Sequence, residues 1–212
     1  MTRRIVLFGG SFDPIHLGHL ITARAVAEHF GFETITFLPA GTAPHKAAGP
    51  AAAPAEDRLE MGRRAIAGED RFEVSDLEIR GPQPSYTIQT LRALRERHGL
   101  GVELCWIVGA DMLADLPTWH RADEVVDAAR IITACRPPYT GQMDAILGRL
   151  SVRFTAEQMA RLSAGLAPTP QIDISSSDIR RRAGAGRPIT YLTHDTVVAY
   201  IGDHHLYGAG ES

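Results

Sequence analysis

Short apolar runs alternate with longer amphipathic segments along most of the chain. Runs typical of buried strands lie at 5–8, 34–38, 72–77, 102–108, 130–134 and 171–174. Apolar residues recur at helical spacing over 17–30, 57–67, 87–98 and 195–204, and a less regular helical region covers 142–166. Strands that alternate with helices in this way predict βαβ units and therefore a parallel sheet. The segment 47–55, rich in alanine and proline, lacks this periodicity and predicts a loop, which is a candidate lid.

The composition is that of a globular protein with a substantial core. The chain has 212 residues, of which 44% are hydrophobic and 22% are charged, and we find no internal repeat, so a single domain over 1–212 is expected. The formal net charge of -3 provides no basic face, and no run of Lys and Arg is present that could follow a nucleic-acid backbone. We therefore expect no nucleic-acid partner.

Cysteine usage and hydropathy bear on where the protein works. Cys105 and Cys135 both lie in apolar segments, which gives no support to a disulfide framework or a zinc ribbon and favours a reducing compartment. The first residues have too few apolar positions for a signal peptide, and no apolar stretch is long enough to cross a bilayer. A cytoplasmic location without a membrane partner is expected.

Two histidines follow a glycine turn at the end of the first predicted strand. The segment 9–20 reads GGSFDPIHLGHL, so that His16 and His19 lie three positions apart where the first helix begins. They then share one face of its first turn, and Gly18 lets a ligand approach the backbone. Helix N–H groups beside imidazole donors suit a phosphate that gains charge in a transition state. Two surface histidines on a helical turn are the alternative interpretation.

A second candidate phosphate site lies where the predicted strand at 171–174 meets the helix after it. The segment 174–180 reads ISSSDIR, in which Ser176 or Ser177 can cap the helix while its N–H groups bind phosphate. Arg180 lies one turn further on and can donate to a phosphate oxygen. An ordinary serine cap followed by a solvated arginine is the alternative.

Together these motifs resemble those of bacterial nicotinate-nucleotide adenylyltransferases. GGSFDPIHLGHL is similar to the signature of the nucleotidyltransferase superfamily, which also contains pantetheine-phosphate adenylyltransferases and cytidylyltransferases. The pyridine-nucleotide branch is indicated by further motifs, at 44–46 (PHK), 85–87 (SYT), 90–91 (TL), 109–111 (GAD), 117–119 (PTW) and 174–180. The resemblance spans nearly the whole chain.

The resemblance implies a fold and a reaction. The fold is an α/β, Rossmann-like, doubly wound parallel sheet flanked by helices, the nucleotidyltransferase fold, with a small helical C-terminal part. The reaction is transfer of AMP from ATP to nicotinate mononucleotide, which gives deamido-NAD and pyrophosphate in NAD biosynthesis. The mononucleotide phosphate would attack the α-phosphorus of ATP directly, without a covalent intermediate. Mg²⁺ is implied as well, held largely by phosphates and water, and no protein ligand to a metal is predicted.

The resemblance also assigns candidate site residues. His16 and His19 are the catalytic candidates, with His19 expected at the transferred α-phosphate. The expected ATP-binding residues are Gly9, Gly10, Ser11, Phe12 through its backbone, His16, Gly18, His19, Gly109, Asp111, Ile174, Ser175, Ser176 and Arg180. The expected residues for nicotinate mononucleotide are Ser11, His45, Lys46, Tyr86, Thr87 and Trp119.

Several of these residues keep a structural alternative. Trp119 can stack on the pyridinium ring of the mononucleotide, or it can be a core or surface plug. Asp111 can accept from a ribose hydroxyl or cap a helix, and His45 and Lys46 can close over phosphates or lie exposed on a loop. Backbone N–H groups near Tyr86 would favour the nicotinate carboxylate over an amide.

The chain departs from the family pattern at two positions. Ala43 stands where many relatives have a proline, and His120 follows Trp119 where a tyrosine is frequent. The rival functions are another adenylyl- or cytidylyltransferase and a nucleotide sensor without catalysis, although a sensor would not need the two histidines. The sequence leaves open whether the chain forms a homo-oligomer, how strongly the acid is preferred over the amide, and whether 47–55 closes on substrate.

Overall fold

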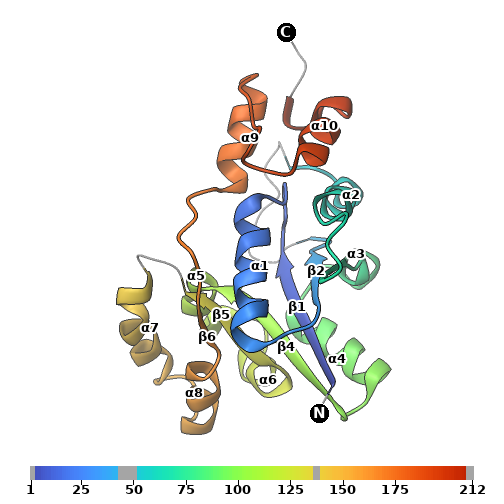
Figure 1. Ribbon diagram of the computed structural model, residues 1–212. Helices are drawn as coiled ribbons and strands as arrows, with labels where there is room; N and C mark the ends of the chain where they lie inside the picture. Colours follow the sequence, from blue (N-terminus) through green and yellow to red (C-terminus); the bar gives the residue numbers. More distant parts are fainter. Residues whose placement is uncertain (1–2, 43–51, 136–138, 209–212) are drawn as a thin grey trace. The chain divides into compact units, whose positions relative to one another are not determined.

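The computed structural model describes residues 3–42, 52–135 and 139–208 and has an α/β architecture (Figure 1). A six-stranded sheet has the order β3-β2-β1-β4-β5-β6. From one edge to the other, the strands are β3 (Phe72–Val74), β2 (Ile35–Pro39), β1 (Arg3–Gly10), β4 (Val102–Gly109), β5 (Arg130–Cys135) and β6 (Leu166–Pro168). The pairs β1 with β4, β4 with β5, and β5 with β6 are parallel. This is the strand order of a Rossmann-like, doubly wound sheet, so the predicted fold class is confirmed.

Helices connect the strands, as the alternating pattern predicted. They are α1 (Leu17–Phe30), α2 (Ala55–Ala65), α3 (Leu77–Arg80), α4 (Thr87–His98), α5 (Ala110–Ala114), α6 (Ala122–Ala128), α7 (Met143–Leu150), α8 (Ala156–Ser163), α9 (Ser176–Gly184) and α10 (Asp195–Asp203). Short 3₁₀ turns lie at η1 (Leu116–Thr118), η2 (Tyr139–Gln142) and η3 (Leu206–Gly208). No helix of the described ranges has the length and hydropathy needed to cross a membrane.

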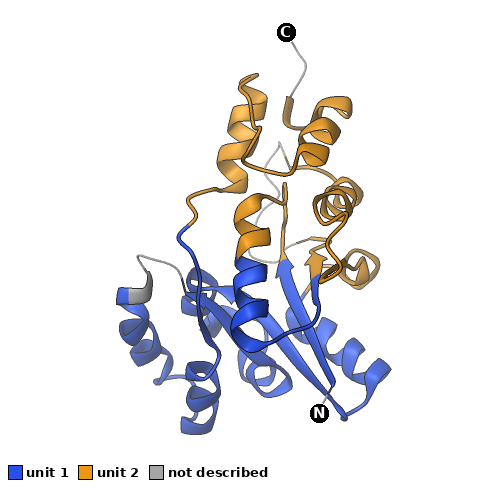
Figure 2. Ribbon diagram, viewed as in Figure 1, with its two compact units in different colours: residues 1–9, 22–36, 86–171 blue, residues 10–21, 37–85, 172–212 orange. Residues whose placement is uncertain are grey.

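The chain groups into two compact units (Figure 2). Unit 1 consists of residues 1–9, 22–36 and 86–171, and unit 2 consists of residues 10–21, 37–85 and 172–212. Each unit is therefore assembled from three separate stretches of the chain. The expectation of a single domain stays a prediction.

Unit 1 is centred on β4, β5 and β6. Leu104, Ile107 and Ile132 of these strands are at most 2% exposed. Leu7 of β1 lies opposite Trp106 of β4, in a register of pairs that begins at Arg3 and Val102. α4 ends at a glycine, as predicted, because its cap Gly99 has a φ of 71°, which an L side chain adopts only with strain.

Unit 2 packs aromatic side chains beneath the loop that follows β1. The ring of Phe37 contacts Phe12 at 5.5 Å and Phe72 at 5.4 Å between centroids, edge to face in both cases. The C-terminal part of the chain ties this loop down, since the hydroxyl of Thr193 donates to the carbonyl of Ile15 at 2.7 Å. The loop that carries the histidine motif is thus fixed from both sides within unit 2.

The predicted helices at 17–30 and 87–98 have the observed bounds, but two predicted strands are wrong in part or whole. The strand expected at 72–77 ends at Val74, because Leu77 already begins α3. The strand expected at 171–174 is absent, and those described residues form no regular element. The last strand is β6 instead, whose backbone finds hydrogen-bonding partners along Thr133–Cys135. Alternating polarity alone could not show which segment has such a partner.

The helical region expected at 142–166 consists of two helices. α8 begins at Ala156 because Thr155 caps it, with the side chain of Gln158 bonded back to the Thr155 backbone. This capping box is readable in the sequence TAEQ and marks the start of a new helix. α6, which is short, was not predicted, and a helix near α5 was expected only in the alternative interpretation of Asp111.

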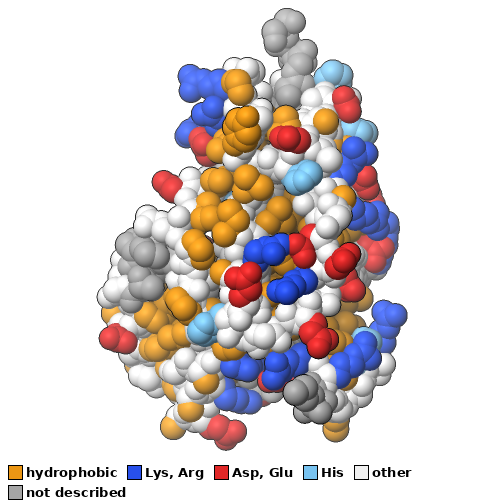
Figure 3. Space-filling model, in the orientation of Figure 1, with side chains coloured by type: hydrophobic (Ala, Val, Ile, Leu, Met, Phe, Trp, Pro, Cys, Tyr) orange, Lys and Arg blue, Asp and Glu red, His pale blue; other side chains and the backbone are white. Residues whose placement is uncertain are grey.

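Charged side chains of both signs lie interspersed on the face drawn in Figure 3. This distribution agrees with the formal net charge of -3. It does not resemble the single-sign stripe that follows a nucleic-acid backbone.

Candidate active site

The loop after β1 is shaped by close packing around Phe12, within unit 2. A Cβ on Gly10 would lie 3.0 Å from the Phe12 ring, so a larger residue there would require the ring to shift. Phe12 itself has a φ of 47° and is 2% exposed, and its ring meets His19 edge to face at 5.0 Å. The Phe12 ring therefore packs in the core. The ring also supports the imidazole of His19.

His16 and His19 lie against each other at the start of α1. Their ring centroids are 3.7 Å apart with the planes inclined by 22°, and the backbone N–H of His16 donates to Nδ1 of His19 at 3.2 Å. Because Nδ1 of His19 accepts, its neutral imidazole carries the proton on Nε2. His16 is 6% exposed, whereas His19 is half-buried. His19 is therefore the member of the pair that can reach a ligand.

Gly18 has a geometric reason to be glycine. A Cβ at this position would lie 3.0 Å from the ring of His16 and 3.5 Å from Ile172. A side chain would press on the imidazole stack. Gly18 therefore has a packing role in addition to the predicted one, which is to keep the backbone accessible to a ligand.

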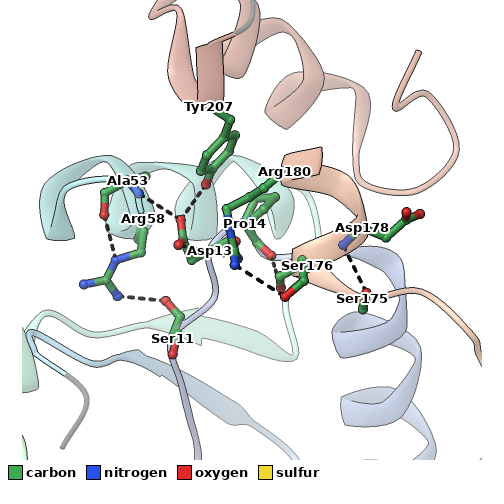
Figure 4. A network of polar contacts seen from close by, with 11 residues as sticks. Ser11, Asp13, Pro14, Ala53, Arg58, Ser175, Ser176, Asp178, Arg180 and Tyr207 are labelled. Carbon is green, nitrogen blue, oxygen red and sulfur yellow. Dashed lines mark hydrogen bonds and ion pairs between the residues drawn. The ribbon is translucent and has the colours of Figure 1, made fainter. Parts of the chain in front are cut away.

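Asp13 is the centre of a buried polar network in unit 2 (Figure 4). The residue is 7% exposed. Oδ1 accepts from the backbone N–H of Ala53 at 3.1 Å and from the hydroxyl of Tyr207 at 2.7 Å. Oδ2 lies 3.6 Å from a guanidinium nitrogen of Arg180. The carboxylate is therefore paired and hydrogen-bonded, as a buried charge must be.

Ala53, whose N–H donates to Asp13, is also a partner of Arg58 from α2. The Arg58 guanidinium donates to the carbonyls of Ser11 at 2.7 Å, Gly41 at 2.8 Å and Ala53 at 3.2 Å. Arg58 is 7% exposed, and this burial lowers its pKa, an effect that the negative charge of Asp13 opposes. One side chain thus holds the ends of β1 and β2 and the start of α2 together.

The serine motif begins α9, also in unit 2. Ser175 caps the helix by accepting from the N–H of Asp178 at 3.1 Å, so the expectation that Ser176 or Ser177 is the cap is wrong. The hydroxyl of Ser176 instead donates to the carbonyl of Pro14 at 2.9 Å. Ile174 lies immediately before the cap, half-buried.

Arg180 reaches the loop after β1 from the second turn of α9. One of its nitrogens donates to the backbone carbonyl of Asp13 at 2.6 Å, and another lies 3.4 Å from the hydroxyl of Ser177. The solvated arginine of the alternative interpretation is therefore wrong. Within unit 2, the structure brings Arg180 and Ser176 to the backbone of the loop that precedes His16.

In unit 1, Gly109 and Asp111 lie where β4 passes into α5. A Cβ on Gly109 would lie 2.4 Å from Oδ1 of Asp111, so glycine leaves room for the carboxylate beside the backbone. Asp111 lies in the first turn of α5 and is exposed, whereas the cap position belongs to Gly109. The interpretation of Asp111 as a helix cap is therefore wrong. Gly9 has a related constraint, because its Cβ would lie 2.4 Å from the ring of Trp106.

A second group of unit 1 residues contains the acceptor-side candidates. The rings of Tyr86 and His120 are 4.5 Å apart, and this contact joins the start of α4 to the residue after Trp119. Thr87 is the first residue of α4, where backbone N–H groups have no partner inside the helix. Trp119 is 9% exposed, and within the described part of the chain its Nε1–H has no hydrogen-bond acceptor. His45 and Lys46 lie outside the described residues.

The sequence is similar to known proteins over its whole length. A family model described as cytidylyltransferase-like matches residues 7–182. A probable nicotinate-nucleotide adenylyltransferase of Symbiobacterium thermophilum is 42% identical over 211 residues, which cover 99% of this chain and 97% of that protein. One from a Roseiflexus species is 43% identical over 206 residues, covering 96% of this chain and 97% of that protein. The chain belongs to the nicotinate-nucleotide adenylyltransferase family.

The structural comparison shows the fold. A Plasmodium falciparum nicotinic acid mononucleotide adenylyltransferase, solved in complex with NaAD, superposes with a TM-score of 0.77. The match covers 99% of this chain and 100% of that chain, at 19% sequence identity. The two proteins share the nucleotidyltransferase fold.

In this nicotinate-nucleotide adenylyltransferase family member, two residues that bond to the loop after β1 were missed from the sequence. Arg58 was missed because its burial, which requires partners for the guanidinium, is seen only in the fold. Tyr207 was missed because it lies near the end of the chain and far from the motif in sequence. Burial and the nearby Asp13 carboxylate raise the pKa of the Tyr207 hydroxyl, so it is a donor at neutral pH.

Proposed function

We propose that the protein transfers the AMP group of ATP to nicotinate mononucleotide and releases deamido-NAD and pyrophosphate. The observation that carries the proposal is the hydrogen bond from His16 to Nδ1 of His19, which makes Nε2 of His19 a donor at the start of α1. An oriented donor of this kind stabilises charge that develops on a phosphate oxygen in the transition state. The family to which the chain belongs supports the same reaction.

In the proposed mechanism, the phosphate of the mononucleotide attacks the α-phosphorus of ATP. A new P–O bond forms there, the bond to the β-phosphate oxygen breaks, and pyrophosphate leaves with the electron pair. No protein nucleophile takes part. His19 donates to the α-phosphate, while the backbone of Gly10 and Phe12 and the hydroxyl of Ser11 line the loop that receives it. Arg180, with one nitrogen on the Asp13 carbonyl, uses its remaining donors for the β- or γ-phosphate.

The remaining ATP contacts are proposed from the helix termini. Ser175, Ser176 and Ile174 lie at the start of α9, whose first N–H groups suit an anion. Asp111 is exposed at the end of β4, where its carboxylate can accept from a ribose hydroxyl. Gly109 supports this role because it leaves space for that carboxylate.

For the acceptor, we propose that Trp119 stacks on the pyridinium ring. An indole face attracts a cationic aromatic ring, and its unpaired N–H gives the site a donor within the described residues. The first N–H groups of α4, at Thr87 and next to Tyr86, would donate hydrogen bonds to the nicotinate carboxylate. An amide would present its NH₂ to these donors, so the acid is the expected substrate. His45 and Lys46 are proposed as phosphate contacts from the sequence alone.

Mg²⁺ fits this scheme as a companion of ATP. Within the described ranges, no three His, Cys, Asp or Glu side chains gather as metal ligands. The groups at the motif loop are mostly donors, which suit phosphate oxygens rather than a cation. ATP phosphates and water would therefore hold the ion, which neutralises phosphate charge when bound.

The proposal includes a single domain and a cytoplasmic location. The buried thiols of Cys105 and Cys135, which form no disulfide, support a reducing compartment. Limited proteolysis tests the first point, because a single domain would resist cleavage between its units. Cell fractionation tests the second.

The deciding experiment measures pyrophosphate release from ATP and Mg²⁺ with three acceptors supplied separately at equal concentration. These are nicotinate mononucleotide, nicotinamide mononucleotide and phosphopantetheine. We expect release with the nicotinate compound well above the other two, and deamido-NAD as the product by mass spectrometry. Release with phosphopantetheine alone would keep the fold and overturn the substrate. No release with any acceptor, from a protein that binds ATP, would favour a nucleotide sensor.

A further inference from the structure

We propose that Tyr207 is a positioning residue for the ATP phosphates, which acts through Asp13 on Arg180. The inference rests on the proposed function, and it assigns a role to the C-terminal turn η3. Figure 4 shows the Tyr207 ring pointing toward the Asp13 side chain, which Arg180 approaches from α9. All three residues belong to unit 2.

The two carboxylate oxygens of Asp13 have different partners. Oδ1 is held by the hydroxyl of Tyr207 at 2.7 Å and by the N–H of Ala53 at 3.1 Å. Oδ2 faces Arg180 at 3.6 Å, which is longer than a hydrogen bond. The two hydrogen bonds on Oδ1 thus hold the carboxylate near Arg180. They also prevent it from forming a bidentate ion pair with the guanidinium. Arg180 keeps donors for a phosphate.

The backbone of Tyr207 has an unusual conformation. Its φ of 63° places a bulky side chain in the left-handed region, which such residues adopt only where the surroundings hold them. Gly184, the last residue of α9, packs closely against Tyr207. A Cβ on Gly184 would lie 2.9 Å from the Tyr207 carbonyl oxygen. The chain therefore brings η3 against the helix that carries Arg180, and glycine at 184 permits it.

Removal of the hydroxyl has a definite consequence in this arrangement. Without Tyr207 as donor, Asp13 keeps one of its two bonds on Oδ1 and can rotate toward Arg180. A closer pair would withdraw Arg180 from ATP. The change is confined to phosphate binding, so the mononucleotide site should be unaffected.

The chain offers a matched control for the test. Tyr200 of α10 also donates its hydroxyl to a carboxylate, that of Asp57, at 2.8 Å. Tyr200→Phe and Tyr207→Phe thus remove the same kind of bond from the same unit. We expect Tyr207→Phe to raise KM for ATP about tenfold, the usual size for a lost hydrogen bond to a charged group, with KM for nicotinate mononucleotide unchanged. Tyr200→Phe should leave both constants within about twofold. Equal KM values for ATP in the two variants would overturn the proposal.

Two further measurements separate positioning from general damage. The analogue p-aminophenylalanine at position 207 keeps the ring and restores a donor, so KM for ATP should return to within about threefold of wild type. A folded analogue protein with KM still raised tenfold would contradict the role of the hydroxyl. In a protein that already carries Arg180→Ala, the further change Tyr207→Phe should raise KM for ATP by less than about twofold. A further tenfold rise in KM for ATP would show that Tyr207 does not act through Arg180.

Failure of the proposed function would be visible separately. If the wild-type protein made no deamido-NAD, the inference would still be tested by calorimetry with a non-hydrolysable ATP analogue. We then expect about tenfold weaker binding by Tyr207→Phe than by Tyr200→Phe. Equal affinities would overturn it.

Discussion

The backbone N–H of His16 donates to Nδ1 of His19 at 3.2 Å, and the two imidazole rings stack with centroids 3.7 Å apart. The first histidine of the motif is therefore an orienting element for the second. Because His16 is buried, His19 is the imidazole that a ligand can reach, and Phe12 supports His19 edge to face at 5.0 Å. An imidazole held on two sides loses little freedom when a phosphate binds, which is the condition for stabilising a transition state.

Replacement of His19 should therefore affect turnover more than binding. We expect His19→Ala to lower kcat by about 10²–10³, the range for loss of one oriented donor, and to change KM for ATP by no more than a few-fold. Steady-state pyrophosphate release measures both constants. His29→Ala, near the other end of α1, is the control and should retain wild-type rates. Turnover of His19→Ala within a few-fold of wild type would remove the residue from catalysis.

Arg58 should matter to stability more than any exposed arginine. Its substitution by Met leaves the carbonyls of Ser11, Gly41 and Ala53 without their buried donor and leaves Arg180 as the positive charge near Asp13. Loss of one partner of a buried charged network costs about 3–5 kcal/mol, so Arg58→Met should lower the free energy of unfolding by that amount in urea. Arg153→Met removes an exposed pair with Asp123 and should cost far less. Equal losses would mean that the Arg58 bonds contribute little.

The sequence predicts most of the sheet and its longest helices because those segments bury continuous apolar faces. The segments at 17–30 and 87–98 are clear since their periodicity and their glycine stops coincide. It fails at 171–174, where the alternation resembles a strand but the free edge of β5 pairs with Leu166–Pro168. Pairing depends on which segment reaches the edge, and a local pattern holds no information on that.

In the candidate site too, residues whose roles depend on near neighbours in the sequence could be predicted, and residues whose roles depend on distant contacts could not. His16, His19 and Gly18 are predicted because their chemistry follows from three neighbouring positions. The roles of Arg58 and Tyr207 depend on contacts with residues 47 and 194 positions away in the sequence. No motif spacing could indicate such a contact.

Trp119 provides a test of the acceptor side. We expect Trp119→Ala to raise KM for nicotinate mononucleotide about tenfold, because a cationic ring loses its stacking partner, while kcat stays within about threefold. Because Trp119 is also buried, Leu116→Ala is the control, since Leu116 is 1% exposed in the adjoining turn η1. It should lower the thermal midpoint and leave KM near wild type. A similar KM in all three proteins would assign Trp119 to the core alone.

Stability at high pH should report the two tyrosine–aspartate bonds. Burial and the neighbouring carboxylate Asp57 raise the pKa of Tyr200 to about 12, and the pKa of Tyr207 is raised for the same reasons by Asp13. A pKa raised above the unfolded value of about 10 contributes stability that is complete below pH 10 and is lost as pH rises through the folded value. The free energy of unfolding of the wild type should therefore fall above pH 10 more steeply than that of Tyr200→Phe or Tyr207→Phe. Urea unfolding between pH 8 and pH 11 measures this, with Tyr191→Phe, whose residue is 83% exposed, as the control. Parallel curves for all four proteins would show that neither hydroxyl is held in its neutral form by the fold.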